Sequence, residues 1–438
     1  QIAAALAGTK SYPFWTDTEK GNVIFRWADF PPTERQTKEA AMKRMGLILL
    51  LVGVLAWVGL ATGAAAEEGV TATEIHIGQW SPQTGPAAAW GSVARGTDAF
   101  FKMLNARGGI HGRKLIHHMF DDAYNPAKTK AGVKELQEGI GMFAWVSGVG
   151  TAPGLAVRDY LMERGVPWVG PSAGSRHWID PPHKYLFAVY PLYEIEAMAL
   201  CRYAVANMGN QKIAIIYQND DYGKNGLDGA RKELARHGLE LVAEVPVNIT
   251  DSDLKPHVME LKKSGAEAVL LWTTVKHAVM TVGISKAMRF DTQFMSTSTC
   301  SDFPLMMHIS KGAWEGVIAA TFAELPDSGY PLLQTYKQEA FDQYAAKDER
   351  WGLFYYAGIA FAEPLVEAIR RCGPNLTRER LVQELEGLKN FKGISGDITY
   401  KPFAPNDPSC RQGQNQTFLV QCQADGSAKQ LTGWASIE

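Results

Sequence analysis

Residues 78–126 read GQWSPQTGPAAAWGSVARGTDAFFKMLNARGGIHGRKLIHHMFDDAYNP. An apolar strand expected at residues 74–80 leads into a loop that contains Pro82 and Gly85. A helix follows and stops at Gly108, before a second strand and an acidic pair. Strand, glycine-rich loop, helix and strand in this order are typical of a βαβ unit in a parallel sheet. Ligands of such sheets bind in loops beyond the carboxyl ends of the strands.

The alternation of strands and helices continues outward from this unit. One set of strands runs to about residue 190, and a second set runs from residue 191 to about residue 321. Each set alone would form a doubly wound α/β lobe, and two in tandem predict a cleft between them. The mainly helical remainder is expected to cover the first lobe. The expected strands of the two sets lie at residues 75–80, 114–121, 142–147, 166–169, 185–189, 212–217, 239–247, 268–272 and 292–295.

The composition is that of an ordinary globular protein. The chain has 438 residues, of which 46% are hydrophobic and 21% are charged, and its formal net charge is −2. This length suits two or three domains. Because there is no basic excess and no block of like charges, nucleic acid is not an expected partner.

The only long apolar run lies at residues 46–60, after Lys43 and Arg44 and before three alanines that end at Ala66. A positive start, an apolar centre and a small-residue end predict a secretory signal peptide at residues 42–66. The run is short for a membrane-spanning helix, which needs about 20 residues. An uncleaved membrane anchor is the alternative. Residues 1–41 lie upstream of a natural start at Met42 and are expected to lie outside the native protein.

The chain has five cysteines, which suits an exported protein with at most two disulfides. Cys410 and Cys422 flank a polar loop and are candidates for a local disulfide. Cys201 lies in an apolar stretch and is expected to be a buried thiol. Cys300 and Cys372 have no obvious partner. Since no Cys-x-x-Cys occurs, a zinc or thiol-redox site is not indicated.

The sequence offers few enzyme signatures. It contains no H-E-x-x-H and no Walker phosphate loop. His117 and His118 are neighbours on one strand, so they face opposite ways and cannot chelate one metal ion. Asp121 and Asp122 end that strand, where such a pair usually caps a helix or anchors a loop. No catalytic residue, metal or cofactor is therefore expected.

Two loops rich in small residues are more informative. Residues 148–154 (GVGTAPG) and residues 170–175 (GPSAGS) each separate a strand from the next helix. Glycine lets a ligand approach the backbone, and the helix after Thr151 offers free N–H groups and a partial positive charge. The two loops together would cradle a carboxylate. Tight strand–helix turns explain the same composition, and the loops alone do not decide between the two.

Two aromatic residues also stand in loops before helices, beside a glycine in each case: Trp90 and Tyr222. Burial of a side chain of this size is worth about 2–3 kcal/mol, so neither is expected to stay in water. A ligand held between the lobes would bury them, and so would packing on their own lobe. Trp272 ends an apolar strand and is expected in the core.

The chain resembles the leucine/isoleucine/valine-type periplasmic binding proteins, the substrate receptors of ABC transporters. The resemblance extends from about residue 74 to the C-terminus. It implies two α/β lobes joined by three crossings, near residues 189–191, 321–326 and 405–415. Lobe 1 would comprise residues 73–190 plus 322–410, and lobe 2 residues 191–321 plus 411–438. The stretches that carry it are Gly85-Pro86 with Trp90-Gly91, residues 104–112, Asp121-Asp122 with Pro126, Tyr222-Gly223, and residues 292–295.

The resemblance also assigns ligand contacts. Trp90 matches an aromatic that lies against the ligand side chain, and Tyr222 matches a second-lobe tyrosine that closes over the ligand. Hydroxyl and backbone groups of the two small-residue loops would bind the ligand's carboxylate and amino group. Those loop positions are Thr151, Ala152, Ser172, Ala173 and Gly174.

Two departures from the family pattern bear on the ligand. Amino-acid-binding members have a Glu that pairs with the ligand ammonium where this chain has Ser298, and a further tyrosine is replaced near Val275. Burying an ammonium without its carboxylate costs several kcal/mol. We therefore expect a ligand with a carboxylate or amide but no obligatory ammonium, either branched-chain amino acid-like or an aromatic or aliphatic acid.

The resulting expectation is a monomeric periplasmic receptor that closes about a hinge and delivers its ligand to an inner-membrane permease. Two other classes remain open. A ligand-sensing regulator or receptor domain shares this fold, but it would need a cytoplasmic address or a membrane tether. A secreted hydrolase would need a nucleophile–base pair in the cleft, for which the sequence offers no sign.

Overall fold

The computed structural model describes residues 11–16, 24–29, 42, 45 and 67–436. The chain divides into two units, residues 1–66 and residues 67–438. In the first unit, β1 (Ser11–Thr16) pairs antiparallel with β2 (Ile24–Asp29), two strands that the sequence did not predict. The signal peptide expected at residues 42–66 lies outside the described residues, apart from Met42 and Met45, which are helical. Within the described ranges no helix has the length and apolar character to cross a membrane.

The second unit begins with a parallel five-stranded sheet in the order β4-β3-β5-β6-β7. Helices α3 (Ser92–Ala106), α4 (Pro126–Gly139) and α5 (Thr151–Glu163) connect its strands. All five strands predicted up to residue 190 are confirmed. They are β3 (Glu74–Ser81), β4 (Lys114–Asp121), β5 (Ala144–Val146), β6 (Trp168–Val169) and β7 (Leu186–Phe187).

A seven-stranded sheet follows in the order β16-β15-β12-β11-β10-β8-β9. Five neighbouring strands are parallel, and β15 and β16 add an antiparallel edge. Its strands are β8 (Ile213–Gln218), β9 (Leu241–Val247), β10 (Ala268–Trp272), β11 (Gln293–Ser296), β12 (Ile318–Thr321), β15 (Phe418–Cys422) and β16 (Ala428–Gln430).

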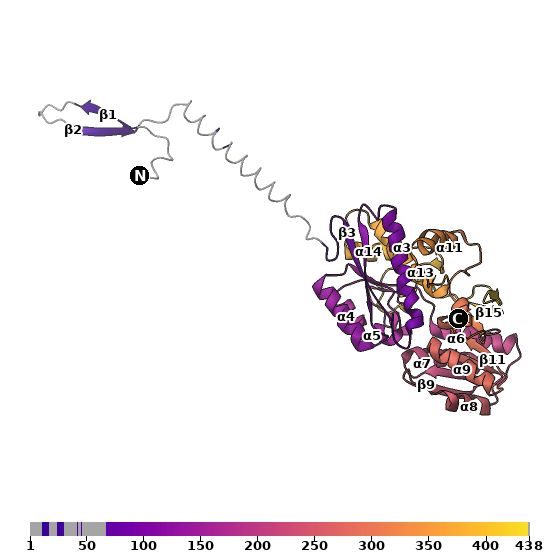
Figure 1. The fold of residues 1–438 in the computed structure, drawn as a ribbon. Helices are drawn as coiled ribbons and strands as arrows, with labels where there is room; N and C mark the ends of the chain where they lie inside the picture. Colours follow the sequence, from indigo (N-terminus) through magenta and orange to yellow (C-terminus); the bar gives the residue numbers. More distant parts are fainter. Residues whose placement is uncertain (1–10, 17–23, 30–41, 43–44, 46–66, 437–438) are drawn as a thin grey trace. The chain divides into compact units, whose positions relative to one another are not determined.

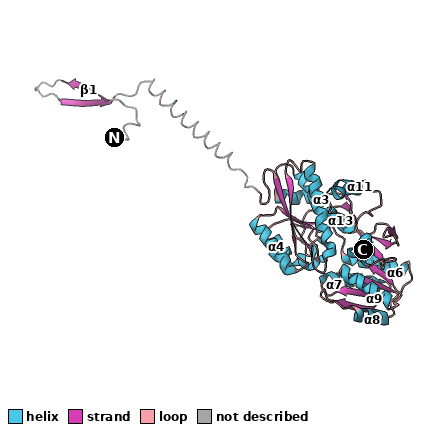
Figure 2. Cartoon of the chain, viewed as in Figure 1, coloured by secondary structure: helices cyan, strands magenta, loops and turns pink. Residues whose placement is uncertain are grey.

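The helices of this second lobe are α6 (Tyr193–Ala206), α7 (Asp221–Arg236), α8 (Lys255–Lys263), α9 (Val275–Ala287) and the short α10 (Phe303–Ile309). Figure 2 shows strands and helices alternating through both lobes. Two α/β lobes in tandem are thus present, as predicted.

The C-terminal helices cover the first lobe, as expected. Helix α13 (Leu353–Cys372) lies along α3 (Figure 1). Glycine permits this close approach, because a Cβ on Gly96 would lie 1.8 Å from Tyr355 O and one on Gly358 would lie 1.8 Å from Val93 O. The remaining elements of this region are α11 (Pro331–Tyr336), a π-helical turn (Lys337–Phe341), α12 (Asp342–Tyr344), α14 (Arg378–Glu386), β13 (Phe391–Gly393) and β14 (Gly396–Ile398).

The chain passes between the two sheets three times: after β7, after β12 and before β15. The first and third crossings are tied together, because Ala188 N donates to Arg411 O over 2.9 Å and Gly413 N donates to Ala188 O over 2.8 Å. On the second crossing, Glu324 N donates to Ile394 O over 2.8 Å. The three-stranded hinge of the predicted fold class is therefore confirmed.

The acidic pair anchors a loop and a helix start, as the sequence favoured. Asp121 accepts hydrogen bonds from Gln83 N and from Thr84, which fixes the loop after β3. Asp122 accepts from Tyr124 N over 2.9 Å and from Thr129 Oγ1 over 2.7 Å. The pair thus positions the loop that carries Tyr124.

The candidate disulfide is not formed. All five cysteines of the chain are free and buried. Cys410 lies in the 3₁₀ turn Pro408–Arg411, before the third crossing, whereas Cys422 ends β15 beyond it. The polar segment between the two cysteines is therefore a lobe crossing rather than a closed loop.

Candidate functional site

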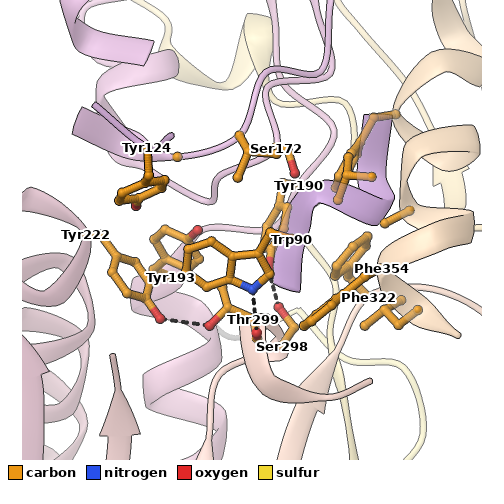
Figure 3. Close-up of a pocket in the computed structure, with 16 residues that line it drawn as sticks. Trp90, Tyr124, Ser172, Tyr190, Tyr193, Tyr222, Ser298, Thr299, Phe322 and Phe354 are labelled. Atoms are coloured by element: carbon orange, nitrogen blue, oxygen red, sulfur yellow. Dashed lines mark hydrogen bonds between the residues drawn. The ribbon is translucent and has the colours of Figure 1, made fainter. Parts of the chain in front are cut away.

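A cavity lies between the two lobes at the carboxyl ends of their strands (Figure 3). About 440 Å³ in and around it is not filled by protein atoms, part of which is open to solvent. None of the described residues that line it carries a charged side chain. They are Trp90, Val93, Tyr124, Val149, Gly150, Ser172, Tyr190, Tyr193, Tyr222, Ser298, Thr299, Phe322, Leu353, Phe354, Ala357 and Phe361.

Trp90 joins the two lobes. It lies in the 3₁₀ turn Ala88–Gly91 of the first lobe, and its indole Nε1 donates to Thr299 O of the second lobe over 2.9 Å. Its ring centroid is 5.6 Å from that of Tyr124 and 6.5 Å from that of Tyr222. Only 6% of its surface is exposed. Trp90 is thus buried in the wall between the lobes and not in the core of its own lobe.

Tyr222 stands in the first turn of α7, which begins close to the end of β8. A Cβ on Gly223 would lie 1.9 Å from Gln218 O, so only glycine fits there. The Tyr222 hydroxyl lies 2.8 Å from Thr299 Oγ1 and donates to Thr273 O over 3.3 Å. Burial raises the pKa of this phenol well above its usual value, so it stays neutral.

The two small-residue loops meet, but only part of them reaches the cavity. Gly150 N donates to Ser172 O over 3.3 Å, and both residues line the cavity. Gly150 has φ +100°, and a Cβ there would lie 2.4 Å from the Tyr124 ring. The lack of a side chain at residue 150 therefore makes room for the Tyr124 ring, which forms part of the cavity wall. The structure brings Trp90, Ser172, Tyr222 and Ser298 together around one cavity.

The other predicted loop contacts lie behind this surface. Thr151, Ala152, Ala173 and Gly174 are not among the lining residues. Thr151 Oγ1 is buried and has no hydrogen-bond partner among the described residues. Gly174 supports the first crossing, because its carbonyl accepts from Tyr193 N over 2.7 Å. Ligand contact by these four residues stays a prediction.

Ser298 rests on a buried carboxylate that the sequence reasoning missed. Ser298 Oγ lies 2.5 Å from Tyr190 Oη and 2.5 Å from Glu196 Oε1. Glu196 is fully buried on α6, and its other oxygen accepts from Thr297 Oγ1 over 2.5 Å and from Ser298 N over 3.1 Å. Burial raises the pKa of Glu196 to about 7. The two acidic residues in the first turn of α6, Glu194 and Glu196, were the available signal.

Sequence reasoning also missed most of the aromatic wall. Tyr190 and Tyr193 come from the first crossing and the start of α6, Phe322 from the second crossing, and Phe354 and Phe361 from α13. The ring of Tyr190 packs 4.4 Å from that of Phe322. Val275 begins α9 outside the lining.

No metal site accompanies this cavity in the part of the chain that the structure describes, where no group of three His, Cys, Asp or Glu could hold an ion. His117 lies 2.9 Å from Gln79 Oε1 and His118 lies 2.9 Å from His76, so the neighbouring histidines have separate partners, as their alternation on β4 predicts. The arrangement suits the enclosure of an uncharged apolar body with polar groups at its rim.

Comparison with known proteins identifies the family of this chain. Residues 74–427 match the family described as periplasmic binding protein. Leu/Ile/Val-binding protein homolog 3 of Brucella melitensis is 30% identical over 223 residues, which is 51% of this chain and 58% of that relative. The chain thus aligns with little more than half the length of this relative.

Solved structures agree on the fold. A substrate-binding periplasmic protein from Ralstonia solanacearum is 26% identical with a TM-score of 0.75, covering 82% of this chain and 100% of that chain. A branched-chain amino acid ABC transporter protein from Thermus thermophilus, solved with bound valine, is 20% identical with a TM-score of 0.74, covering 83% and 97%. The predicted fold class is confirmed, as is the resemblance to Leu/Ile/Val-type proteins.

Proposed function

Because this chain belongs to the periplasmic binding protein family, we propose that it is the substrate-binding component of an ABC transporter. It captures a small ligand with a carboxylate or amide group and an apolar, preferably aromatic, body. The lobes comprise residues 73–190 plus 322–410 and residues 191–321 plus 411–438. The mature protein begins after Ala66, works in the periplasm as a monomer and delivers its ligand to an inner-membrane permease.

One observation carries the ligand class: the cavity is walled by aromatic rings, and none of its described lining residues is charged. A free ammonium would have to leave water without a partner carboxylate. Glu196 does not serve, because it lies behind Ser298 and already accepts three hydrogen bonds. Burying an unpaired ammonium costs several kcal/mol, which disfavours an amino acid.

Closure follows from the way both lobes share the cavity. A ligand between them touches Trp90 and Ser172 on one side and Tyr222 and Ser298 on the other, so it binds the closed arrangement better than an open one. The hydrogen bond from Trp90 to Thr299 joins the lobes directly, so opening of the lobes would break it. Ligand binding therefore shifts the population toward the form that a permease would recognise.

Calorimetry on refolded, ligand-free protein tests this proposal. Benzoate, benzamide, 3-methylbutanoate and leucine are titrated in turn, with thermal unfolding measured in parallel. We expect at least one probe without an ammonium to bind and to raise the melting temperature. Tight binding of leucine would overturn the ligand class, and failure of all four probes would remove its support.

A further inference from the structure

Three buried groups form a continuous hydrogen-bonded chain from the interior to the cavity. Glu196 Oε1 lies 2.5 Å from Ser298 Oγ, which lies 2.5 Å from Tyr190 Oη. Glu196 is 0% exposed, Ser298 1% and Tyr190 5%. Ser298 and Tyr190 line the cavity, whereas Glu196 does not. The carboxylate therefore reaches a ligand only through the two hydroxyls.

The number of protons fixes the direction of this chain. An ionised carboxylate only accepts, so Ser298 spends its single proton on Glu196. Its oxygen then accepts from Tyr190, whose single proton is used in turn. Tyr190 and Ser298 consequently present only lone pairs to the cavity. We call these two hydroxyls the cavity floor.

The donors to the other carboxyl oxygen of Glu196 determine how this hydrogen-bonded chain reverses its direction when Glu196 is protonated. Glu196 Oε2 already accepts from the Ser298 backbone N–H, which cannot become an acceptor, and from Thr297 Oγ1. A proton on the carboxyl therefore sits on Oε1 and is donated to Ser298 Oγ. Ser298 then donates to Tyr190, and Tyr190 donates into the cavity. Protonation of Glu196 thus converts the cavity floor from acceptor to donor.

Few other groups can disturb this arrangement. No ion pair to Glu196 occurs within residues 67–436, and the titratable groups that face it are the phenols of Tyr190 and Tyr193. Burial raises the pKa of both phenols far above the neutral range, so neither titrates with Glu196. Thr297 donates to Glu196 Oε2 and holds the carboxyl in place.

We propose that Glu196 is a specificity-determining residue that sets the hydrogen-bond direction of the cavity floor. With Glu196 ionised, the site selects a ligand group that donates a hydrogen bond to Tyr190, such as a primary carboxamide, over a carboxylate. The inference rests on the proposed function and narrows its ligand class. Glu196 acts through Ser298 and Tyr190 and does not touch the ligand.

Calorimetry with benzamide and benzoate at pH 8.5 and at pH 7 tests the inference, because neither probe titrates near these pH values. At pH 8.5, where Glu196 is ionised, benzamide should bind at least tenfold more tightly than benzoate. Binding of benzamide favours ionised Glu196, so at pH 7 it should release a proton, seen as a dependence of the observed heat on the ionisation enthalpy of the buffer. Its affinity should rise with pH and level off above the pKa of Glu196, which is about 7.

Glu196→Gln should reverse the preference. The Ser298 N–H holds the amide oxygen at the Oε2 position, so the amide nitrogen donates to Ser298 Oγ and the cavity floor becomes a donor. Benzoate should then bind at least tenfold more tightly than benzamide, without proton release. Ser298→Ala breaks the chain while keeping Glu196 and should also abolish proton release.

Glu363→Gln is the matched control. Glu363 is equally buried on α13, accepts from Tyr336 Oη and Ile394 N over 2.9 Å each, and lies outside the cavity lining. This variant should keep the wild-type preference and proton release. If Glu196→Gln also keeps them, the inference is wrong while the proposed function stands.

A ligand-free readout decides the case in which neither probe binds. The resonance Raman difference between wild type and Tyr190→Phe reports whether this phenol donates or accepts. We expect a donor to Ser298 at pH 8.5 and reversal at pH 5.5, and the reversed state at both values in Glu196→Gln. A signal that is independent of pH and of Glu196 overturns the inference.

Discussion

The two walls of the cavity are built by different means. The first-lobe wall, at Gly150 and Ser172, is shaped by tight loops whose backbone geometry admits only glycine at residue 150. The second-lobe wall, at Tyr222, Ser298 and Thr299, is a set of hydroxyls in two hydrogen-bonded groups, Tyr222 with Thr299 and Ser298 with Glu196. A hydroxyl can act as donor or acceptor, so the second wall has an adjustable polarity, whereas the shape of the first wall is set by its backbone.

Trp90→Ala removes the residue that touches both walls, and it should have the largest effect. The variant loses a ring that is 6% exposed and the hydrogen bond to Thr299 O. We expect a loss of about 4 kcal/mol in the binding free energy of whichever probe binds, roughly a thousandfold in Kd. Calorimetry measures it.

Trp434→Ala serves as the control for tryptophan loss. Trp434 packs 4.6 Å from Phe418, outside the cavity lining. Its removal should leave Kd unchanged within a factor of two. If Trp90→Ala binds like this control, the ligand does not lie between the walls.

The carboxylate behind the second wall should make stability depend on pH. Burial raises the pKa of Glu196 from 4.5 to about 7, so its carboxyl holds a proton longer in the folded state than in the unfolded state. Its contribution is fully present below pH 4.5 and is lost as the pH rises through 7. The loss amounts to about 3 kcal/mol at most.

Urea unfolding of wild type and Glu196→Gln between pH 5 and 8 measures this contribution. The variant should gain stability relative to wild type up to pH 7 and no further. Glu363, with a pKa raised by burial to about 8, should show the same gain in Glu363→Gln, continuing to pH 8. Taking differences from wild type cancels groups such as His277, whose pKa burial lowers. If both variants stopped gaining stability at the same pH, the expected difference between the pKa values of Glu196 and Glu363 would be contradicted.

Gly150→Ala tests the first wall alone. A Cβ at this position meets the Tyr124 ring at 2.4 Å and also strains a backbone with φ +100°. We expect binding to weaken by about 2 kcal/mol, roughly thirtyfold. Gly209→Ala has comparable strain at φ +74° but open space around its Cβ, so it should lower the melting temperature without changing Kd. Weaker binding in both variants would mean that strain, not the wall, is responsible.

The sequence predicted the first wall better than the second for a physical reason. Glycines, prolines and strand–helix alternation act locally, so β3, the loop after it and both small-residue loops were found from their own residues. The same local signals also located Trp90 and Tyr222. Which face of a loop meets the cavity depends on packing, and Thr151 and Gly174 lie behind the surface for that reason.

The missed residues are those brought in over long distances along the chain. Glu196 meets Ser298 across about a hundred positions, and Phe354 and Phe361 reach the cavity only because α13 lies along α3. No local pattern encodes such contacts. The disulfide expectation failed in the same way, because the polar segment before Cys422 is a lobe crossing.

Tyr222→Phe is the finest test of the second wall, with the smallest expected effect. The change keeps the ring against Trp90 and removes only the hydroxyl that lies 2.8 Å from Thr299 Oγ1. A neutral hydrogen bond of this kind contributes about 1 kcal/mol, so Kd should rise about fivefold. Because Tyr222 is not part of the chain from Glu196, the proton release and the preference between benzamide and benzoate should stay as in wild type. A changed preference would show that the hydroxyls of this wall act as one network, and the adjustable polarity would then extend beyond the cavity floor.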